Sequence, residues 1–201
     1  MNAAPLHSRV MCPTLTSKIM SATEAARLIP SGARVGMSGF TGSGHPKDVP
    51  VALAHRIEEA HARGEPFKIS VWTGASTAPE LDGALAKADA INMRLPYQSD
   101  PNCRKRINAG EMDYTDIHLS HVAQYAWFGF LGHLDYAVIE VAGVLPDGRL
   151  IPATSIGNNK TWLDQADKII LEVNSWPNLE IEGMHDIYYG TALPPHRKPI
   201  P

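Results

Sequence analysis

The sequence predicts an α/β fold in which helices flank a mostly parallel sheet, and three observations support this class. Short apolar runs that fit buried strands alternate with segments of helical apolar periodicity along most of the 201 residues. Glycine-rich or small-residue loops separate the two kinds of segment. The apolar fraction of 44% is that of a globular chain that buries a core. This alternation indicates right-handed strand–helix–strand units.

The predicted helices have recognisable ends or a shared apolar face. They span, in chain order, 22–29, 47–62, 79–87, 118–128 and 160–166. Ser21 and Glu24 form a capping-box pattern at the start of the first helix. Pro79 suits the first turn of the third. The second helix has an apolar face made of Val49, Leu53, Ile57 and Ala60. Gly64 is placed to end this helix.

The predicted strands are short apolar runs bounded by turn residues. They span 33–38, 67–72, 90–95, 135–142, 150–153 and 168–173, of which 135–142 is the clearest. A turn is expected at 146–148. Residues 1–15 are expected to form an irregular arm and 16–192 the α/β domain. Residues 193–201 are a proline-rich segment that would link to a further domain.

Four loops are expected at the carboxyl ends of strands, where ligands bind in sheets of this class. They span 39–46, 73–77, 96–101 and 143–146. In the first, Gly39, Gly42 and Gly44 would let backbone amides approach an oxyanion. The loop is neither a dinucleotide fingerprint, because a third glycine is missing after Gly44, nor a P-loop. A plain strand-to-helix turn is the alternative.

Hydroxyl and basic residues occur on the next two loops. Ser76 could donate a hydrogen bond to a carboxylate, and the alternative is that Thr77 caps the following helix. Tyr97 and Ser99 lie on the third loop of the same rim. The basic cluster 104–106 could meet the phosphates of a nucleotide, or it is a solvated helix face.

Glu140 is the best candidate in the chain for a carboxylate nucleophile or base. An acid inside an apolar run is costly unless it is paired or functional. The alternative is a structural carboxylate that bonds backbone amides or a cation. His118 and His121 have the spacing of a metal pair, but no third ligand follows, so no metal site is expected.

Composition excludes several other classes. With a net charge of −3 and a pI of about 6.3, no nucleic-acid partner is expected. The apolar stretches are too short to span a bilayer, and the first ten residues do not form a signal peptide. A cytoplasmic protein without membrane partner is therefore expected. Cys12 and Cys103 lie far apart and are expected to be reduced thiols.

Several segments in the same order resemble the acetyl-CoA hydrolase/transferase family, a branch of the class I CoA-transferases that includes succinyl-CoA:acetate CoA-transferases. The segments are 38–47, 73–77, 81–83, 106–110, 155–158, 170–174 and 182–187. The resemblance runs from about Thr16 to the end. It implies two α/β domains in tandem, of which this chain supplies the first.

The resemblance also implies a reaction on acyl-CoA, such as acetyl-CoA or succinyl-CoA, and acetate. A glutamate attacks the thioester to give an anhydride, CoA returns to form a glutamyl-CoA thioester, and an incoming carboxylate takes the CoA. Attack by water instead gives hydrolysis. The glutamate and most CoA contacts belong to the family's second domain. No catalytic residue is therefore expected in this chain, Glu140 does not match the nucleophile, and CoA is a substrate and not a bound cofactor.

The implied substrate-facing residues are Gly39, Phe40, Gly42, Gly44, Ser76, Tyr97 and Ser99. Among them, Ser76 matches a serine of the family's carboxylate pocket, and Ser99 stands where a hydroxyl residue reaches that pocket. The implied partner is a second CoA-transferase domain or subunit. A homo-oligomer is also expected, because a domain that packs on another exposes an apolar face when alone. The alternative is a stand-alone, non-catalytic module that binds a carboxylate or assists assembly.

Overall fold

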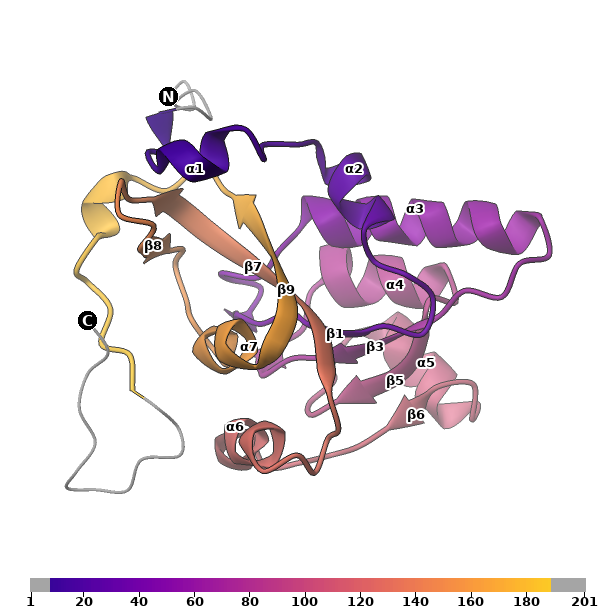
Figure 1. Ribbon diagram of the computed structural model, residues 1–201. Coiled ribbons are helices and arrows are strands. Elements are labelled where there is room, and N and C mark those ends of the chain that lie inside the picture. The colour runs from indigo at the N-terminus through magenta and orange to yellow at the C-terminus, as the bar shows by residue number, and fades with distance from the viewer. Residues whose placement is uncertain (1–7, 189–201) are drawn as a thin grey trace.

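The computed structural model describes residues 8–188, whose strands and helices alternate along the chain (Figure 1). The strands are β1 (Arg34–Gly36), β2 (Phe40–Thr41), β3 (Ile69–Trp72), β4 (Ala75–Ser76), β5 (Ile91–Leu95), β6 (Asp113–Tyr114), β7 (Leu134–Val144), β8 (Leu150–Pro152) and β9 (Ala166–Val173). The helices are α1 (Pro13–Thr16), α2 (Ala22–Arg27), α3 (Asp48–Ala62), η2 (Pro79–Gly83), α4 (Ala84–Lys87), α5 (Pro101–Asn108), α6 (Leu119–Trp127), α7 (Asn159–Gln165) and η3 (Leu179–Ile181).

One seven-stranded sheet organises these elements. Its order is β6-β5-β3-β1-β7-β8, and β9 also pairs with β7. Every paired strand in it is parallel to its neighbour except β8, which runs antiparallel to β7. The predicted α/β class with a mostly parallel sheet is therefore confirmed. In the described residues no helix is long and apolar enough to cross a membrane.

Helices cover both faces of the sheet, and each face has its own apolar core (Figure 1). On the side of α2, α3 and α4, buried residues such as Leu53 and Ile57 pack on the strands. On the side of α6 and α7, Trp72 and Trp162 lie with ring centroids 6.0 Å apart. Burying Leu or Ile side chains of this kind contributes about 1.5–3 kcal/mol each to folding. The two cores hold the sheet in place, and the predicted ligand-binding loops follow the carboxyl ends of its strands.

Some helix ends are set by residues next to them in the sequence, and one is set by a distant residue. Ser21 Oγ accepts a hydrogen bond from Glu24 N, and Glu24 Oε2 accepts one from Ser21 N, so the predicted capping box is confirmed. Gly64 has a φ of +77°, which suits the predicted end of α3. The start of α3 has a cap that is distant in sequence. Glu172 of β9 accepts from the amides of Lys47 and Val49.

Three segments differ from the sequence prediction. Within the expected irregular arm, Arg9 is buried and donates to Ala142 O at 3.0 Å, while α1 follows shortly after. The expected helix 79–87 is a π-helical turn, η2, that continues into α4. Helix α5 had been anticipated only through the helix-face alternative for 104–106, and strand β6 had no counterpart in the prediction. The proline-rich segment 193–201 lies outside the described residues.

The fourth expected loop, 143–146, does not open at the rim. Gly143 and Val144 continue β7 and pair with β8, because the antiparallel partner extends the strand beyond the rest of the sheet. A Cβ on Gly143 would lie 2.9 Å from Leu179 Cδ2, so this stretch is packed in the interior. The segment 154–158, which follows β8, contacts the rim loops instead.

Candidate functional site

The first two predicted loops converge at the carboxyl ends of neighbouring strands. β1 and β3 pair in parallel in the main sheet, and the loops that follow them pair again through β2 and β4. Phe40 stands opposite Ala75, and Thr41 opposite Ser76. The side chain of Phe40 is 59% exposed, so it borders the outer side of this small sheet.

The glycines of the first loop serve chain packing more than ligand approach. Gly44 has a φ of +67°, and a Cβ there would lie 2.3 Å from Ser155 Oγ. At Gly39 a Cβ would meet the carbonyl oxygen of Ser43 at the same distance. Only Gly42 of the three has open space around its Cβ position. Of the predicted glycines, Gly42 is thus the one whose backbone faces a free volume.

The segment 154–158 locks the two loops together, and the sequence analysis did not place it at the rim. Gly157 has a φ of +54°, and a Cβ there would lie 2.4 Å from Gly39 O. Asn158 donates from its backbone to Ser38 Oγ at 2.9 Å and from its side-chain amide to Thr73 O at 3.1 Å. The resemblance at 155–158 was the signal that pointed to this segment.

Ser76 and Ser99 lie on adjoining loops. The Ser76 side chain is fully buried, and its Oγ has no hydrogen-bond partner within the described part of the chain. Thr77 Oγ1 lies 2.6 Å from Ser99 Oγ, so one hydroxyl pair bridges the second and third loops. Tyr97, on the third loop, is 47% exposed. The rim thus combines one unsatisfied hydroxyl with exposed aromatic and hydroxyl side chains.

Glu140 is engaged in a structural ion pair. Its carboxylate is 2% exposed, with Oε2 lying 2.6 Å from Lys47 Nζ and Oε1 accepting a hydrogen bond from Asn174. Lys47 Nζ also donates to His45 O, which ties the end of the glycine loop to β7. Both oxygens are therefore satisfied, and this arrangement favours the structural alternative for Glu140. In register with it on β9, Glu172 caps α3, and burial raises the pKa of Glu172 against the lowering effect of the helix amides.

His45, at the end of the glycine loop, has a buried imidazole. The residue is 1% exposed, and neither ring nitrogen has a hydrogen-bond partner among the described residues. Its Nε2 lies 3.6 Å from Glu80 Oε2. Burial, and then the charge of Lys47, lower the pKa of His45, and the nearby carboxylates only partly oppose this.

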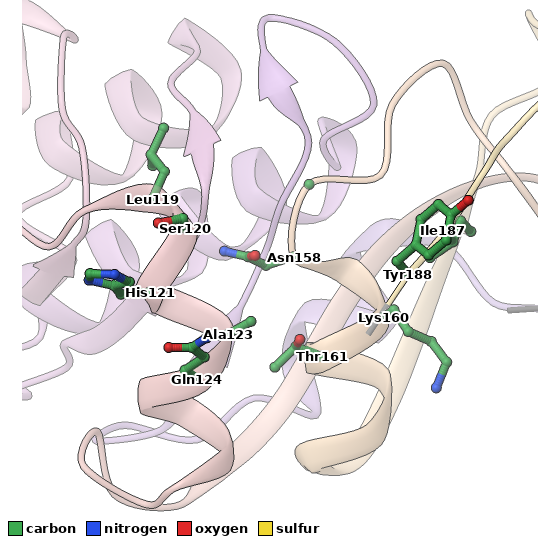
Figure 2. A pocket seen from close by; sticks show the side chains of 11 residues that line it. Leu119, Ser120, His121, Ala123, Gln124, Asn158, Lys160, Thr161, Ile187 and Tyr188 are labelled. Atoms are coloured by element: carbon green, nitrogen blue, oxygen red, sulfur yellow. The ribbon is translucent and has the colours of Figure 1, made fainter. Parts of the chain in front are cut away.

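A polar cavity of about 460 Å³ adjoins the loop cluster through Asn158. It lies between α6, the start of α7 and the segment 187–188 (Figure 2). The polar side chains that line it include Ser120, His121, Gln124, Asn158, Thr161 and Tyr188. The cavity therefore extends the candidate site toward α6.

Of the two histidines with the spacing of a metal pair, one caps a helix and the other lies within it. His118 is the N-cap of α6, and its ring lies 5.4 Å from that of His121. Within residues 8–188, the side chains spaced for a metal ion lie instead at the amino ends of β7 and β9. They are His133, Asp135 and Asp167. His133 already pairs with Asp167 at 2.8 Å, and Asp135 accepts from a backbone amide.

The other charged and thiol residues singled out have ordinary partners. In the basic cluster, Arg106 pairs with Asp89 at 2.8 Å and Glu111 at 3.0 Å, which suits a helix surface. Cys12 and Cys103 are free and buried, and burial raises the pKa of the Cys103 thiol to about 12.

Solved structures share this fold at low sequence identity. A glutaconate coenzyme A-transferase from Acidaminococcus fermentans superposes with a TM-score of 0.55 at 14% identity, over 77% of this chain and 68% of that one. An acyl-CoA transferase from Escherichia coli O157:H7 has a TM-score of 0.53 at 12% identity, over 92% of this chain and 53% of that one.

Curated relatives are closer in sequence. A succinyl-CoA:acetate CoA-transferase of Clostridium kluyveri is 45% identical over 187 residues, which are 93% of this chain and 34% of the relative. A propanoyl-CoA:succinate CoA transferase of Escherichia coli K12 is 42% identical over 90% of this chain and 37% of the relative. An acetyl-CoA hydrolase of Saccharomyces cerevisiae is 36% identical over 98% of this chain and 38% of the relative. The chain thus spans little more than a third of the length of these relatives. Because residues 7–192 match the family described as the acetyl-CoA hydrolase/transferase N-terminal domain, the chain belongs to that family.

Proposed function

We propose that the chain forms the carboxylate-facing wall of an acyl-CoA:carboxylate CoA-transferase or acetyl-CoA hydrolase site, with short acyl-CoA and acetate as substrates. The observation that carries this proposal is the buried, unpartnered hydroxyl of Ser76 at the convergence of the rim loops. Leaving such a group unsatisfied costs about 1–3 kcal/mol. A carboxylate oxygen that accepts its hydrogen bond would recover that cost, so Ser76 is suited to bind the acyl acceptor.

The surrounding residues suit the same ligand. Ser99 Oγ, held by Thr77, offers a second hydroxyl on the adjoining loop. The exposed rings of Phe40 and Tyr97 and the open face of Gly42 border the site. These groups bind and orient a small carboxylate, and they exclude part of the solvent around it.

The covalent steps need a glutamate, and Glu140, the best candidate of the described residues, does not suit that role. Glu140 is held by Lys47 and Asn174, so its carboxylate is not free to attack. The glutamate that attacks the thioester carbonyl and expels the CoA thiolate is assigned to the partner domain. The thiolate then attacks the resulting anhydride, releases the acyl group as a carboxylate and leaves CoA on the glutamate. The acceptor carboxylate bound near Ser76 attacks this second thioester and expels the CoA thiolate, which gives a new anhydride. The thiolate then attacks the acyl carbonyl of the acceptor, so that the new acyl-CoA forms and the glutamate is released.

The length of the relatives supports a partner for this chain. Proteins named as CoA-transferases and acetyl-CoA hydrolases match it over only 34–38% of their length. The partner proposed is the remaining part of such a protein, either as a second domain or as a separate subunit.

A non-catalytic module that binds a carboxylate is the second candidate function. The observation that favours it is that Glu140, the best acid candidate of the described residues, serves as an ion-pair partner, while the Ser76 hydroxyl has no partner among these residues. Such a module would bind acetate or succinate without turning over acyl-CoA.

Turnover by the chain and by a chimera separates the two functions. In the chimera, residues 7–192 replace the matching segment of the Clostridium kluyveri relative. Free CoA and exchanged thioester are followed with succinyl-CoA, with and without acetate. The proposal predicts no turnover by the chain alone and acetate-dependent transfer by the chimera. A folded chimera without transfer would favour the non-catalytic module, and turnover by the chain alone that vanishes in Glu140→Ala would place the nucleophile here.

Self-association of the isolated chain is a further expectation. Tyr125, Phe128 and Phe130 form an exposed aromatic cluster at the C-terminal end of α6, with Phe128 66% and Phe130 73% exposed. Exposed apolar groups of this size favour association. Light scattering is expected to show an oligomer or polydisperse assemblies, and a monodisperse monomer at high concentration would contradict it.

A further inference from the structure

A fully buried ion pair lies behind the second and third rim loops. Arg94 of β5 and Asp82 of η2 are both 0% exposed, and Arg94 Nε lies 2.8 Å from Asp82 Oδ1. The sequence analysis gave neither residue a role, although Asp82 lies in the segment 81–83 that contributes to the family resemblance. The available signal was an arginine between apolar residues of a predicted strand, Met93 and Leu95.

The hydrogen bonds of this pair go to the backbone and side chains of the loops. Arg94 Nη2 donates to Ser76 O at 2.8 Å, and Nη1 donates to Leu95 O. Asp82 accepts from Ala78 N at 3.0 Å and from Gln98 Nε2 at 2.9 Å. One ion pair therefore fixes the residues on both sides of Thr77 and the loop that carries Ser99.

Stability alone does not account for such a pair. Replacing a buried ion pair by apolar residues of similar volume is often neutral or stabilising, because desolvation offsets the Coulomb attraction. Apart from the ion pair itself and the bond to Leu95 O at the end of β5, these hydrogen bonds go to the segments that carry the hydroxyls or adjoin them. These contacts occupy the polar atoms of both side chains, so neither side chain is assigned to the ligand.

We infer that Arg94 and Asp82 are positioning residues, which hold Ser76 and Ser99 at the separation that accepts a small carboxylate. The inference deepens the proposed function and rests on it for the identity of the ligand. The guanidinium fixes the Ser76 carbonyl, which leaves the hydroxyl of the same residue free of the backbone. The Thr77–Ser99 hydroxyl pair then transmits this position to the third loop.

The test uses the whole chain and the double variant Arg94→Met/Asp82→Leu, which removes the pair without leaving an unpaired charge. Arg106→Met is the matched control, because Arg106 also bonds a backbone carbonyl and pairs with acids but contacts neither loop. Hydrogen exchange is measured for the amides of 76–78 and 97–99 and for those of β1 and β3. The double variant is expected to exchange about tenfold faster or more in the loops alone, the effect of losing one bond that holds a segment closed.

Unchanged loop exchange in the double variant would overturn the inference. Should the double variant fail to fold, Arg94→Lys decides the question, because a lysine keeps the charge but lacks the fork that reaches both Asp82 and Ser76 O. It is expected to speed exchange in 76–78, and no change there would also overturn the inference.

A binding arm separates positioning from a merely structural role. Succinate and acetate are titrated into the chain, and amide shifts of Ser76 and Ser99 are followed by NMR. The apparent Kd is expected to weaken tenfold or more in the double variant, less in Arg94→Lys and not in Arg106→Met. Wild-type affinity in a double variant whose loops exchange faster would refute positioning for ligand binding. If the unaltered chain shows no shifts, the carboxylate role of Ser76 fails, and hydrogen exchange still decides whether the pair holds the loops.

Discussion

Replacing Glu140 by alanine tests whether this acid is structural. Breaking a buried pair by removing one partner costs about 3–5 kcal/mol. Lys47 is 35% exposed, so water can solvate its freed ammonium, and the expected loss of unfolding free energy falls to about 2–3 kcal/mol. The lost hydrogen bond from Asn174 is part of this figure. With a urea m-value of about 2–3 kcal/mol per M, the unfolding midpoint should fall by about 1 M.

Urea unfolding followed by circular dichroism measures this shift. Glu65→Ala is the matched control, because Glu65 also pairs with a cation, Arg63, but both side chains are more than half exposed. That control is expected to leave the midpoint in place. A midpoint unchanged in Glu140→Ala, with the same m-value, would show that the carboxylate is not held as the structure has it and would revive its candidacy as a nucleophile.

Two further predictions concern the loop cluster. Because the pKa of His45 lies below its unfolded value of about 6.5, the unfolded chain takes up a proton first, so the unfolding free energy should fall as pH drops below about 6.5. The variant His45→Gln should lose that part of the slope in urea titrations at pH 5–7, and an unchanged slope would contradict the assignment. Gly157→Ala should destabilise the chain by about 2 kcal/mol or more, since its Cβ would meet Gly39 O at 2.4 Å in a left-handed conformation. A wild-type urea midpoint in this variant would mean that the segment 154–158 does not contact the glycine loop at Gly39.

Local patterns predicted most of the fold. The alternation of apolar runs and amphipathic segments gave the parallel α/β class, and the capping box at Ser21 and the glycine stop at Gly64 were read correctly because both depend on neighbouring residues. The cap of α3 was not predictable in this way. It comes from Glu172, which lies more than 120 residues away and reaches the helix only after the sheet has formed.

Part of the candidate site was predictable from the sequence, because the order of parallel strands determines which loops lie together. The convergence of the loops after β1 and β3 follows from the parallel sheet, so the loops containing Gly42 and Ser76 were placed together correctly. The segment around Asn158 was missed because it follows an antiparallel strand and reaches the rim by a path that strand order does not encode. The buried pair of Arg94 and Asp82 was missed because an isolated charge in a sequence does not reveal its partner.

The central claim is that Ser76 presents its free hydroxyl to the acceptor carboxylate. The measurement that tests it most directly is the KM for acetate of the chimera containing residues 7–192, with and without Ser76→Ala, beside the urea stability of both. Because the hydroxyl is buried without a partner, the variant should be as stable as the parent or up to about 1 kcal/mol more stable. Its KM for acetate should rise about tenfold or more. An unchanged KM in an equally stable variant would show that Ser76 does not bind the acceptor.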